Sequence, residues 1–390
     1  MLCQTMGKKR LFHKEDIMII AYPNYLKDFI CSGEHCKDTC CQSWEIQIDN
    51  PTWKKYQTFY KEREDWWKGK LNKKEKSLIF KNGKCQFLDC NGLCQIQKQY
   101  GFSSLCKTCK EYPRHLEIYG ERKEWTLSLS CPEVAKLVLL RKEKVQFLSK
   151  EKEGVSPYEE ELSKKEIAFY CDIREKFLEI LQDRACSIKE RIASILVLSH
   201  DIENKIKRGD YEAVNRIFAK YQREKETGKL SRKFTAYEVE SDIKEAYVKT
   251  CMQLLQEMEP IDSKCMQIID TVVKELDKSK EEQNKEQNRS NFPIEEELFY
   301  ENLMVYFISV YVVGAVYDEE LESKVKLAIF SYLIIGQVAQ WLGEQEAVIE
   351  FVWKYSRQLE HSSQNLEWLE EILQTEHAFS YKSLLSCTLS

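Results

Sequence analysis

Ten of the sixteen cysteines lie close together, between residues 31 and 131. Thiolates supplied by several loops are the ligands that zinc and iron–sulfur clusters require. In a reducing compartment such cysteines are not expected to form structural disulfides. The clustering therefore predicts a metal-binding module in the first third of the chain. The ten are Cys31, Cys36, Cys40, Cys41, Cys85, Cys90, Cys94, Cys106, Cys109 and Cys131.

Two other kinds of cysteine chemistry fit this pattern less well. Cys106-x-x-Cys109 has the spacing of a redox dithiol, but the βαβ context of that motif is missing. Radical enzymes that cleave S-adenosylmethionine carry a Cys-x-x-x-Cys-x-x-Cys loop in a βα barrel, whereas the first four cysteines here are separated by four, three and zero residues. Buried thiols without a ligand role remain an alternative for Cys90 and Cys106. His35 is a second-choice ligand, because a surface histidine is the simpler interpretation.

The remaining cysteines are scattered, and most fall on apolar helical patterns where a thiol is a small core residue. They are Cys3, Cys171, Cys186, Cys251, Cys265 and Cys387.

The cysteine-rich part predicts short elements. Alternation at Trp44, Ile46 and Ile48 indicates a half-buried strand, and the alternation on either side of residues 119–123 indicates a β-hairpin. Aromatic residues at helical spacing predict a helix over residues 51–68. A further helix is expected to begin near Pro132, with Ser130 as its cap, Glu133 completing a capping box and Cys131 at its positive end.

From about residue 150 onward the pattern becomes one helix after another. Ser156…Glu159 and Ser187…Glu190 are capping boxes ahead of apolar periodic runs. Residues 278–291 contain no apolar side chain, which predicts an exposed linker. The fold class is therefore mainly α. We expect a cysteine-rich metal-binding N-terminal module with short strands over residues 1–150, followed by a multi-helix C-terminal region over residues 151–390.

Composition limits the function. The chain has 390 residues, a formal net charge of −5 and a pI near 5.9, which argues against a protein that coats nucleic acid. Residues 61–84 carry nine lysines and arginines against four acidic residues, as a solvated face or as a docking patch for an acidic partner. The apolar stretches 302–317 and 327–342 are shorter than the ~20 residues of a membrane span. We expect buried core helices there, no targeting segment, no membrane association and a cytoplasmic location.

Four blocks of sequence together resemble the FliB family of flagellin lysine-N-methylases. The resemblance is specific over residues 20–140 and diffuse beyond, where it rests on Tyr300-Glu301-Asn302-Leu303. The blocks are Phe29-Ile-Cys31 through Cys36-Lys-Asp38-Thr39-Cys40-Cys41-Gln42-Ser-Trp44-Glu-Ile-Gln-Ile-Asp49, Cys85-Gln-Phe87-Leu88-Asp89 with Gly92-Leu93-Cys94, Thr108-Cys109-Lys-Glu-Tyr112-Pro113-Arg114, and Ser128-Leu-Ser130-Cys131-Pro132-Glu133.

The resemblance narrows the set of metal ligands from ten cysteines to eight. Cys90 and Cys106 fall where the family pattern is looser and are left out. Eight thiolates imply one 4Fe–4S cluster with spare thiols, or two metal sites, and zinc remains an alternative metal. The implied ligands are Cys31, Cys36, Cys40, Cys41, Cys85, Cys94, Cys109 and Cys131.

The resemblance also implies an activity, namely methyl transfer from S-adenosylmethionine to lysine side chains of flagellin. The chain has no Gly-x-Gly-x-x-Gly loop and only 13 glycines, so a cofactor pocket of a different design is expected. Candidates come from the matched blocks, because the reaction needs a carboxylate to take the lysine proton and aromatic or charged groups to hold the cofactor. They are Asp38, Tyr112 and Glu133 for catalysis, and Trp44 and Arg114 for cofactor binding.

Two other functions stay open at this stage. One is a non-enzymatic scaffold that binds zinc or iron, and the other is an iron–sulfur protein that transfers electrons. Binding of S-adenosylmethionine would distinguish the methylase from both.

Overall fold

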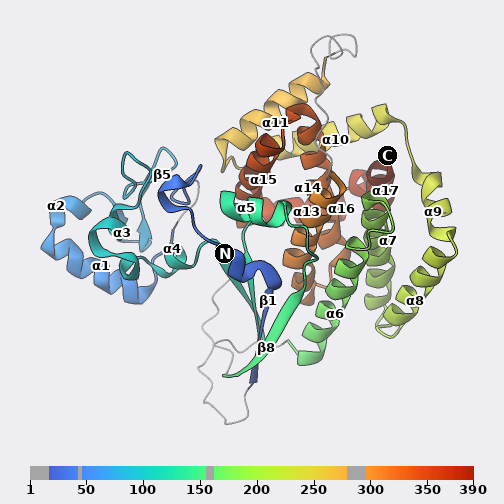
Figure 1. Ribbon diagram of the computed structural model, residues 1–390, viewed down its shortest axis with the longest axis horizontal. Coiled ribbons are helices and arrows are strands. Elements are labelled where there is room, and N and C mark those ends of the chain that lie inside the picture. Colours follow the sequence, from blue (N-terminus) through green and yellow to red (C-terminus); the bar gives the residue numbers. More distant parts are fainter. Residues whose placement is uncertain (1–16, 43–45, 155–161, 279–295) are drawn as a thin grey trace.

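The computed structural model describes residues 17–42, 46–154, 162–278 and 296–390. Figure 1 shows a small lobe, drawn in blue, beside a larger helical body. The two parts have separate hydrophobic cores. The smaller core takes its residues from 46–109, and the larger one runs from Tyr25 to Leu389. The expected mainly helical fold with short strands near the N-terminus is confirmed, while the domain boundary at residue 150 stays a prediction.

Short elements build the small lobe. Helix α1 (Asn50–Glu62) breaks at Arg63 and is followed by α2 (Glu64–Trp67), so the helix expected over 51–68 is present in two pieces. The strands are two-residue pairs, and the helices α3 and α4 are a turn or two long. These elements are β2 (Leu71–Asn72), β3 (Ser77–Leu78), β4 (Phe80–Lys81), β5 (Lys84–Cys85), α3 (Gln95–Tyr100) and α4 (Lys107–Glu111).

Aromatic side chains hold this lobe together. Trp67 is fully buried, with its ring 5.0 Å from the rings of both Tyr56 and Phe87. Ile46 and Ile48 are buried while Gln47 between them is partly exposed and forms a single bridge with Ser77, so the alternation is present without a full strand. Trp44 lies outside the described residues.

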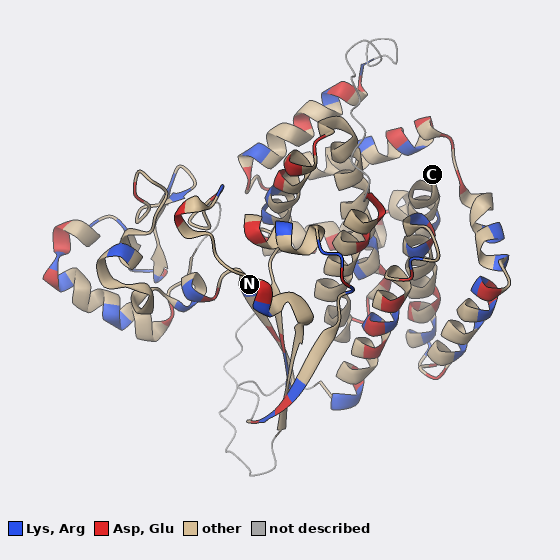
Figure 2. Cartoon of the chain, in the orientation of Figure 1, with Lys and Arg blue, Asp and Glu red and all other residues tan. Residues whose placement is uncertain are grey.

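The basic stretch 61–84 lies on the surface of this lobe, where Figure 2 shows several blue lysine and arginine positions. All nine of its cations are exposed except Lys70, which is partly buried with its ammonium 4.6 Å from the ring of Trp66. A solvated face is confirmed, and a docking role for it stays untested.

A four-stranded sheet in the order β6-β7-β1-β8 joins the lobe to the body. β6 (Arg114–Tyr119) and β7 (Arg122–Leu127) form the expected hairpin, with Gly120 at a positive φ of 52° in its turn. β1 (Ile17–Pro23) runs parallel to β7 and antiparallel to β8 (Phe147–Glu153). On β7, Glu124 is buried and pairs with Arg174 at 2.5 Å.

Helix α5 (Pro132–Leu139) follows the hairpin and begins where the sequence predicts, with Pro132 in its first turn. The expected capping box is wrong. The residue at the N-cap is Cys131, and no side chain caps the helix. Ser130 lies one residue too early to cap this helix, and its hydroxyl contacts other side chains described below.

The body consists of helices that pack around α14. Gly343, at a positive φ of 70°, ends α14 in the left-handed conformation common after helices. The helices are α6 (Lys164–Leu181), α7 (Ile188–Ile206), α8 (Ala213–Glu226), α9 (Lys229–Phe234), α10 (Ser241–Gln256), α11 (Ser263–Leu276), α13 (Glu296–Tyr311), α14 (Leu321–Leu342), α15 (Gln345–Glu360), α16 (Ser363–Thr375) and α17 (Tyr381–Leu389).

The capping box Ser187…Glu190 is confirmed at the start of α7. The box expected at Ser156…Glu159 lies outside the described residues, and α6 instead begins with a capping box of Ser163 and Glu166. The predicted linker lies outside the described residues except for Lys278.

Two segments, Glu296–Val316 and Leu321–Leu342, have 21 and 22 residues and are apolar enough to cross a membrane, so the expectation that these stretches are too short is wrong. Most of each apolar window, 89% and 72% respectively, is nevertheless buried inside the structure, as in the core helices of a globular protein. The expectation of core helices is confirmed, and the cellular location stays a prediction.

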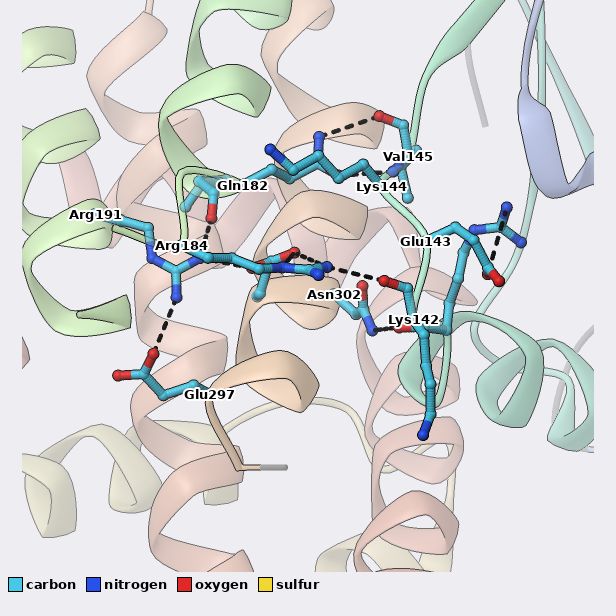
Figure 3. Close-up of polar contacts among 12 residues, drawn as sticks. Lys142, Glu143, Lys144, Val145, Gln182, Arg184, Arg191, Glu297 and Asn302 are labelled. Atoms are coloured by element: carbon cyan, nitrogen blue, oxygen red, sulfur yellow. Dashed lines mark hydrogen bonds and ion pairs between the residues drawn. The ribbon is translucent and has the colours of Figure 1, made fainter. Parts of the chain in front are cut away.

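Polar contacts fix the segment that follows α5 against α6, α7 and α13 (Figure 3). The Gln182 side chain both accepts from the Val145 backbone N–H (2.6 Å) and donates to its carbonyl (3.1 Å). The Asn302 amide donates to the carbonyl oxygens of Leu139 (3.2 Å) and Arg141 (2.7 Å) at the end of α5. These bonds fix the C-terminal end of the helix that begins at Cys131.

Beside Asn302, the buried carboxylate of Glu301 accepts hydrogen bonds from two arginines. Its oxygens lie 2.6 Å from Arg191 Nη1 and 2.9 Å from Arg184 Nη2. Glu301 and Asn302 therefore fasten α13 to its neighbours.

Candidate active site where the cysteine-rich loop meets helix α15

Asp38 lies in the loop between the first cysteines and contacts α15 of the body. Its Oδ2 atom is 2.7 Å from Arg357 Nη1 and 3.2 Å from Lys354 Nζ, and it accepts a hydrogen bond from the indole of Trp353 at 3.3 Å. Burial alone would raise the pKa of Asp38, but the charges of Arg357 and Lys354 outweigh it and lower the pKa. The carboxylate is therefore ionised and paired, which makes it a weak proton acceptor.

Ser130 lies at the centre of a second set of contacts. Arg357 Nε donates to its carbonyl oxygen at 3.0 Å. Its hydroxyl lies 2.6 Å from the hydroxyl of Ser128 and 3.0 Å from both the Tyr112 hydroxyl and His361 Nε2. Arg357 thus connects the Asp38 contacts to a chain of hydroxyl groups.

Glu360, the last residue of α15, receives four hydroxyl hydrogen bonds. Tyr311 lies 3.1 Å from Oε1, Tyr306 3.2 Å from Oε2, Ser356 2.8 Å and Ser128 3.2 Å from the same Oε2. Burial raises the pKa of Glu360, and the hydrogen bonds from these hydroxyls offset only part of that effect. A carboxyl group with a raised pKa is better suited to accept a proton than Asp38.

The structure thus brings two of the five predicted catalytic and cofactor residues into one polar site. Asp38 enters it through Arg357, and Tyr112 through Ser130. The Tyr112 ring also lies edge-on to the ring of His361, with centroids 6.4 Å apart.

The other three predicted residues lie elsewhere or outside the description. Arg114, exposed at the start of β6, places its guanidinium 5.1 Å from the ring of Phe29. Glu133 is partly exposed. The hydrogen bond to Glu346 and the charge of Glu346 are the main causes of the raised pKa of Lys37, and the charge of Glu133 adds a smaller effect. Trp44 lies outside the described residues.

Five of the ten clustered cysteines share the core of the small lobe. Cys85 and Cys106 are buried, and Cys41, Cys94 and Cys109 pack against that core. The backbone N–H of Cys85 donates to the carbonyl of Cys41 at 2.9 Å. Burial raises the pKa of Cys85 to about 12, and the charges of Cys41, Cys94 and Cys106 add to it. These thiols are therefore close enough to interact.

A second group of cysteines lies beside the start of α5. Burial raises the pKa of Cys131 to about 11, with further contributions from the charges of Cys36 and Cys31. A hydrogen bond with the thiol of Cys41 raises the pKa of Cys40, and the charges of Cys131 and Cys31 add to that effect. The adjacent pair Cys40 and Cys41 thus links the two groups.

Thiol groups are donors that suit a soft metal, but these side chains are not arranged as a complete metal site. Within residues 17–42, 46–154, 162–278 and 296–390, no three cysteine, histidine, aspartate or glutamate side chains form a group that could hold a metal ion. Cys106, which the family resemblance left out of the ligand set, lies in the small-lobe group, and its thiol forms a hydrogen bond with that of Cys109. Cys90 and His35 are exposed. Metal binding therefore remains a proposal.

The sequence interpretation missed the contribution of α15. Lys354, Arg357 and His361 recur at intervals of three and four residues, so they share one face of the helix. Such a charged stripe is usually solvated. In this structure Lys354 and Arg357 are buried instead, at 3% and 1% exposure. The sequence feature that could have indicated this site is the row of ionisable residues within an otherwise apolar segment.

These features define a mainly helical protein in which a cysteine-bearing loop and a helix with buried ionisable residues share one polar site. A model of the FliB lysine N-methylase C-terminal domain matches residues 174–387, more than half of the chain. The chain therefore belongs to the FliB lysine N-methylase family.

Three curated relatives from Salmonella align with this chain over 136 positions, and each alignment covers 31% of the chain. The lysine-N-methylases of Salmonella choleraesuis and Salmonella typhimurium are 32% and 34% identical, and the alignment spans 32% of each. The flagellar biosynthetic protein FliU of Salmonella muenchen is 34% identical over 76% of its length. The chain thus matches about a third of the length of the two lysine-N-methylases, and no solved structure matches it.

Proposed function

We propose that this protein transfers methyl groups from S-adenosylmethionine to lysine side chains of flagellin in the cytoplasm. Membership of the family and the names of the Salmonella relatives support lysine methylation. The observation that carries the proposal furthest is that the segment matched by the family model supplies Glu360, Tyr306 and Tyr311, which meet Ser128 of the cysteine-rich part.

The reaction sets requirements that this site can meet. A lysine ammonium has a pKa near 10.4, so presenting the neutral amine at pH 7 costs about 4–5 kcal/mol. A proton acceptor and a partly water-excluded environment lower that cost. Burial raises the pKa of Glu360, which suits a proton acceptor. S-adenosylmethionine supplies the methyl group when it is bound.

The earlier candidates keep distinct proposed roles. In this proposal Tyr112, whose hydroxyl contacts Ser130, binds the ligand, and Asp38, which pairs with Arg357, positions α15. Glu133 as a further proton acceptor, and Trp44 and Arg114 as cofactor-binding residues, remain predictions.

We also propose that the clustered thiols bind a 4Fe–4S cluster or zinc. The residues that would hold it are the eight predicted cysteines, together with Cys106 from the small-lobe group. A metal-binding scaffold or an electron-transfer protein is the alternative that these thiols support by themselves.

Calorimetric titration of S-adenosylmethionine into anaerobically purified protein tests the enzyme proposal against these alternatives. Saturable binding followed by transfer of a labelled methyl group to flagellin supports the methylase. A protein that holds its metal but does not bind S-adenosylmethionine would favour the scaffold or electron-transfer function.

A further inference from the structure

Glu360, which is partly exposed, differs from the buried carboxylates of the described residues in lacking a cationic partner. Within the described parts of the chain, the ion pairs within 4.0 Å include Asp38 with Arg357, Glu124 with Arg174, Glu301 with Arg191 and Glu203 with Lys207, but none that involves Glu360. Carboxylates taken out of water are normally paired with a cation, because desolvation of an isolated charge is expensive.

The four hydroxyl groups around Glu360 do not supply the missing charge. Two come from α13 (Tyr306 and Tyr311), one from the preceding turn of α15 (Ser356), and one from the segment before α5 (Ser128). Neutral hydroxyls orient a carboxylate and satisfy its lone pairs, but they leave its charge uncompensated. The four hydroxyls thus form a cage around the Glu360 carboxylate, and this cage lacks a cation.

The cage is partly accessible to solvent. Tyr306 and Tyr311 are buried, whereas Glu360, Ser128 and His361 are each partly exposed. Among the described residues, three charged or titratable groups close to this site bear on Glu360. The charge of Glu360 acts on His115 of β6. The Arg357 guanidinium is hydrogen-bonded to Asp38 and Ser130. Burial and the Arg357 charge lower the pKa of His361 to about 3, so His361 is neutral.

We propose that Glu360 binds the primary ammonium group of the lysine side chain to be methylated and accepts its proton. This inference rests on the proposed function and names the residue that receives its substrate. A primary ammonium has three N–H donors for the carboxylate and its hydroxyls, whereas the sulfonium of S-adenosylmethionine has none. The geometry therefore favours the amine over the sulfonium as the cation in this cage.

The proton transfer balances without any further reactant. One N–H bond of the ammonium breaks, its proton joins a Glu360 oxygen, and the electron pair stays on the nitrogen. The neutral amine then attacks the methyl carbon, and the C–S bond breaks with its electrons moving to sulfur. The product is a methylated ammonium and a neutral thioether.

Binding of Nα-acetyl-lysine amide to the full chain, measured without S-adenosylmethionine or flagellin, tests the inference. Glu360→Gln keeps an oxygen for the hydroxyl donors but removes the charge, so the amine should bind roughly tenfold more weakly or worse. The control Glu367→Gln, on the exposed side of α16, should leave the affinity unchanged. The Nε-acetylated form of the probe, which is neutral, should not bind the wild type.

Three outcomes overturn the inference: equal amine affinity in the wild type and Glu360→Gln, no amine binding to the wild type, or loss of S-adenosylmethionine binding alone in the variant. Because Glu360→Gln could lower folding yield, Glu360→Asp is the second variant, and it should retain part of the affinity. Glu360-dependent amine binding in a protein that methylates nothing would leave this inference standing and remove the proposed function.

Discussion

The guanidinium nitrogen Nη1 of Arg357 lies 2.7 Å from carboxylate oxygen Oδ2 of Asp38. Asp38 belongs to the cysteine-bearing loop and Arg357 to α15, and their side chains are only 11% and 1% exposed. Because Arg357 also donates to the Ser130 carbonyl, one side chain ties the cysteine loop and the start of α5 to α15, the helix that also carries the catalytic candidate Glu360.

Replacing Asp38 with Asn should destabilise the contact between the cysteine-bearing loop and α15. Breaking this buried ion pair leaves Arg357 only Asp262 at 4.0 Å and Lys354 only Glu350 at 3.6 Å as acidic partners among the described residues, which costs about 3 kcal/mol. The free energy of unfolding, measured by urea denaturation at pH 7, should fall by that amount. Asp65→Asn, at an exposed position on α2, is the control and should change stability little.

The same pair predicts a pH dependence of stability. The pKa of Asp38 is lower in the folded protein than in the unfolded chain, so its contribution is present above the unfolded value of about 3.9 and disappears as the pH falls through the folded value. The stability difference between wild type and Asp38→Asn should shrink in acid. A difference that stays constant from neutral pH to pH ~2 would refute this linkage.

Much of the fold could be predicted from local sequence signals. The hairpin around Gly120 and the capping box of α7 depend on residues close in sequence, and both are present. The cap of α5 was missed because Ser130 is recruited by Ser128, Tyr112 and His361, which are contacts that sequence spacing does not reveal.

The candidate site was harder to predict because half of it comes from distant helices. Asp38 and Tyr112 stood out within cysteine-rich blocks, but their partners Arg357 and His361 lie more than 200 residues further along. A charged stripe on a helix looks the same in sequence whether it faces water or a buried carboxylate. Only the tertiary contact distinguishes the two.

Asn302→Ala should destabilise the end of α5. The substitution removes two hydrogen bonds to the carbonyls of Leu139 and Arg141 and leaves buried acceptors unsatisfied, at a cost of about 1–3 kcal/mol. Thermal unfolding of the variant measures this loss. Asn204→Ala, at an exposed position on α7, gives the comparison, and equal effects of the two substitutions would contradict the stabilisation of α5 by Asn302.

Cysteine substitutions should separate ligands from core residues. Cys40→Ser or Cys109→Ser should abolish bound metal and destabilise the small lobe, because metal binding is coupled to folding. Cys106→Ser should behave like Cys109→Ser, whereas Cys90→Ser, Cys171→Ser and Cys251→Ser should keep the metal. Iron, zinc and acid-labile sulfide in anaerobically purified variants provide the measurement, and loss of metal in all of these variants would show that the division is wrong.

The pH profile of methyl transfer should depend on the ionisation of Glu360. Its pKa is raised by burial, so the proton-accepting carboxylate forms only above that raised value and the rate should climb with pH. Glu360→Gln should lower turnover roughly a hundredfold and remove that acidic limb. Asp38→Asn and Glu133→Gln test the earlier candidates in the same assay, and a larger loss of turnover in either would transfer the proton-accepting role to it.

The most direct test of the central claim is intact-mass spectrometry of flagellin after incubation with S-adenosylmethionine and anaerobically purified, metal-replete protein, without added reductant. A polar two-electron methyl transfer needs none. The account predicts a ladder of flagellin masses that rise by one methylene unit per step and map to surface lysines. Flagellin of unchanged mass, with metal and S-adenosylmethionine both bound to the protein, would contradict it.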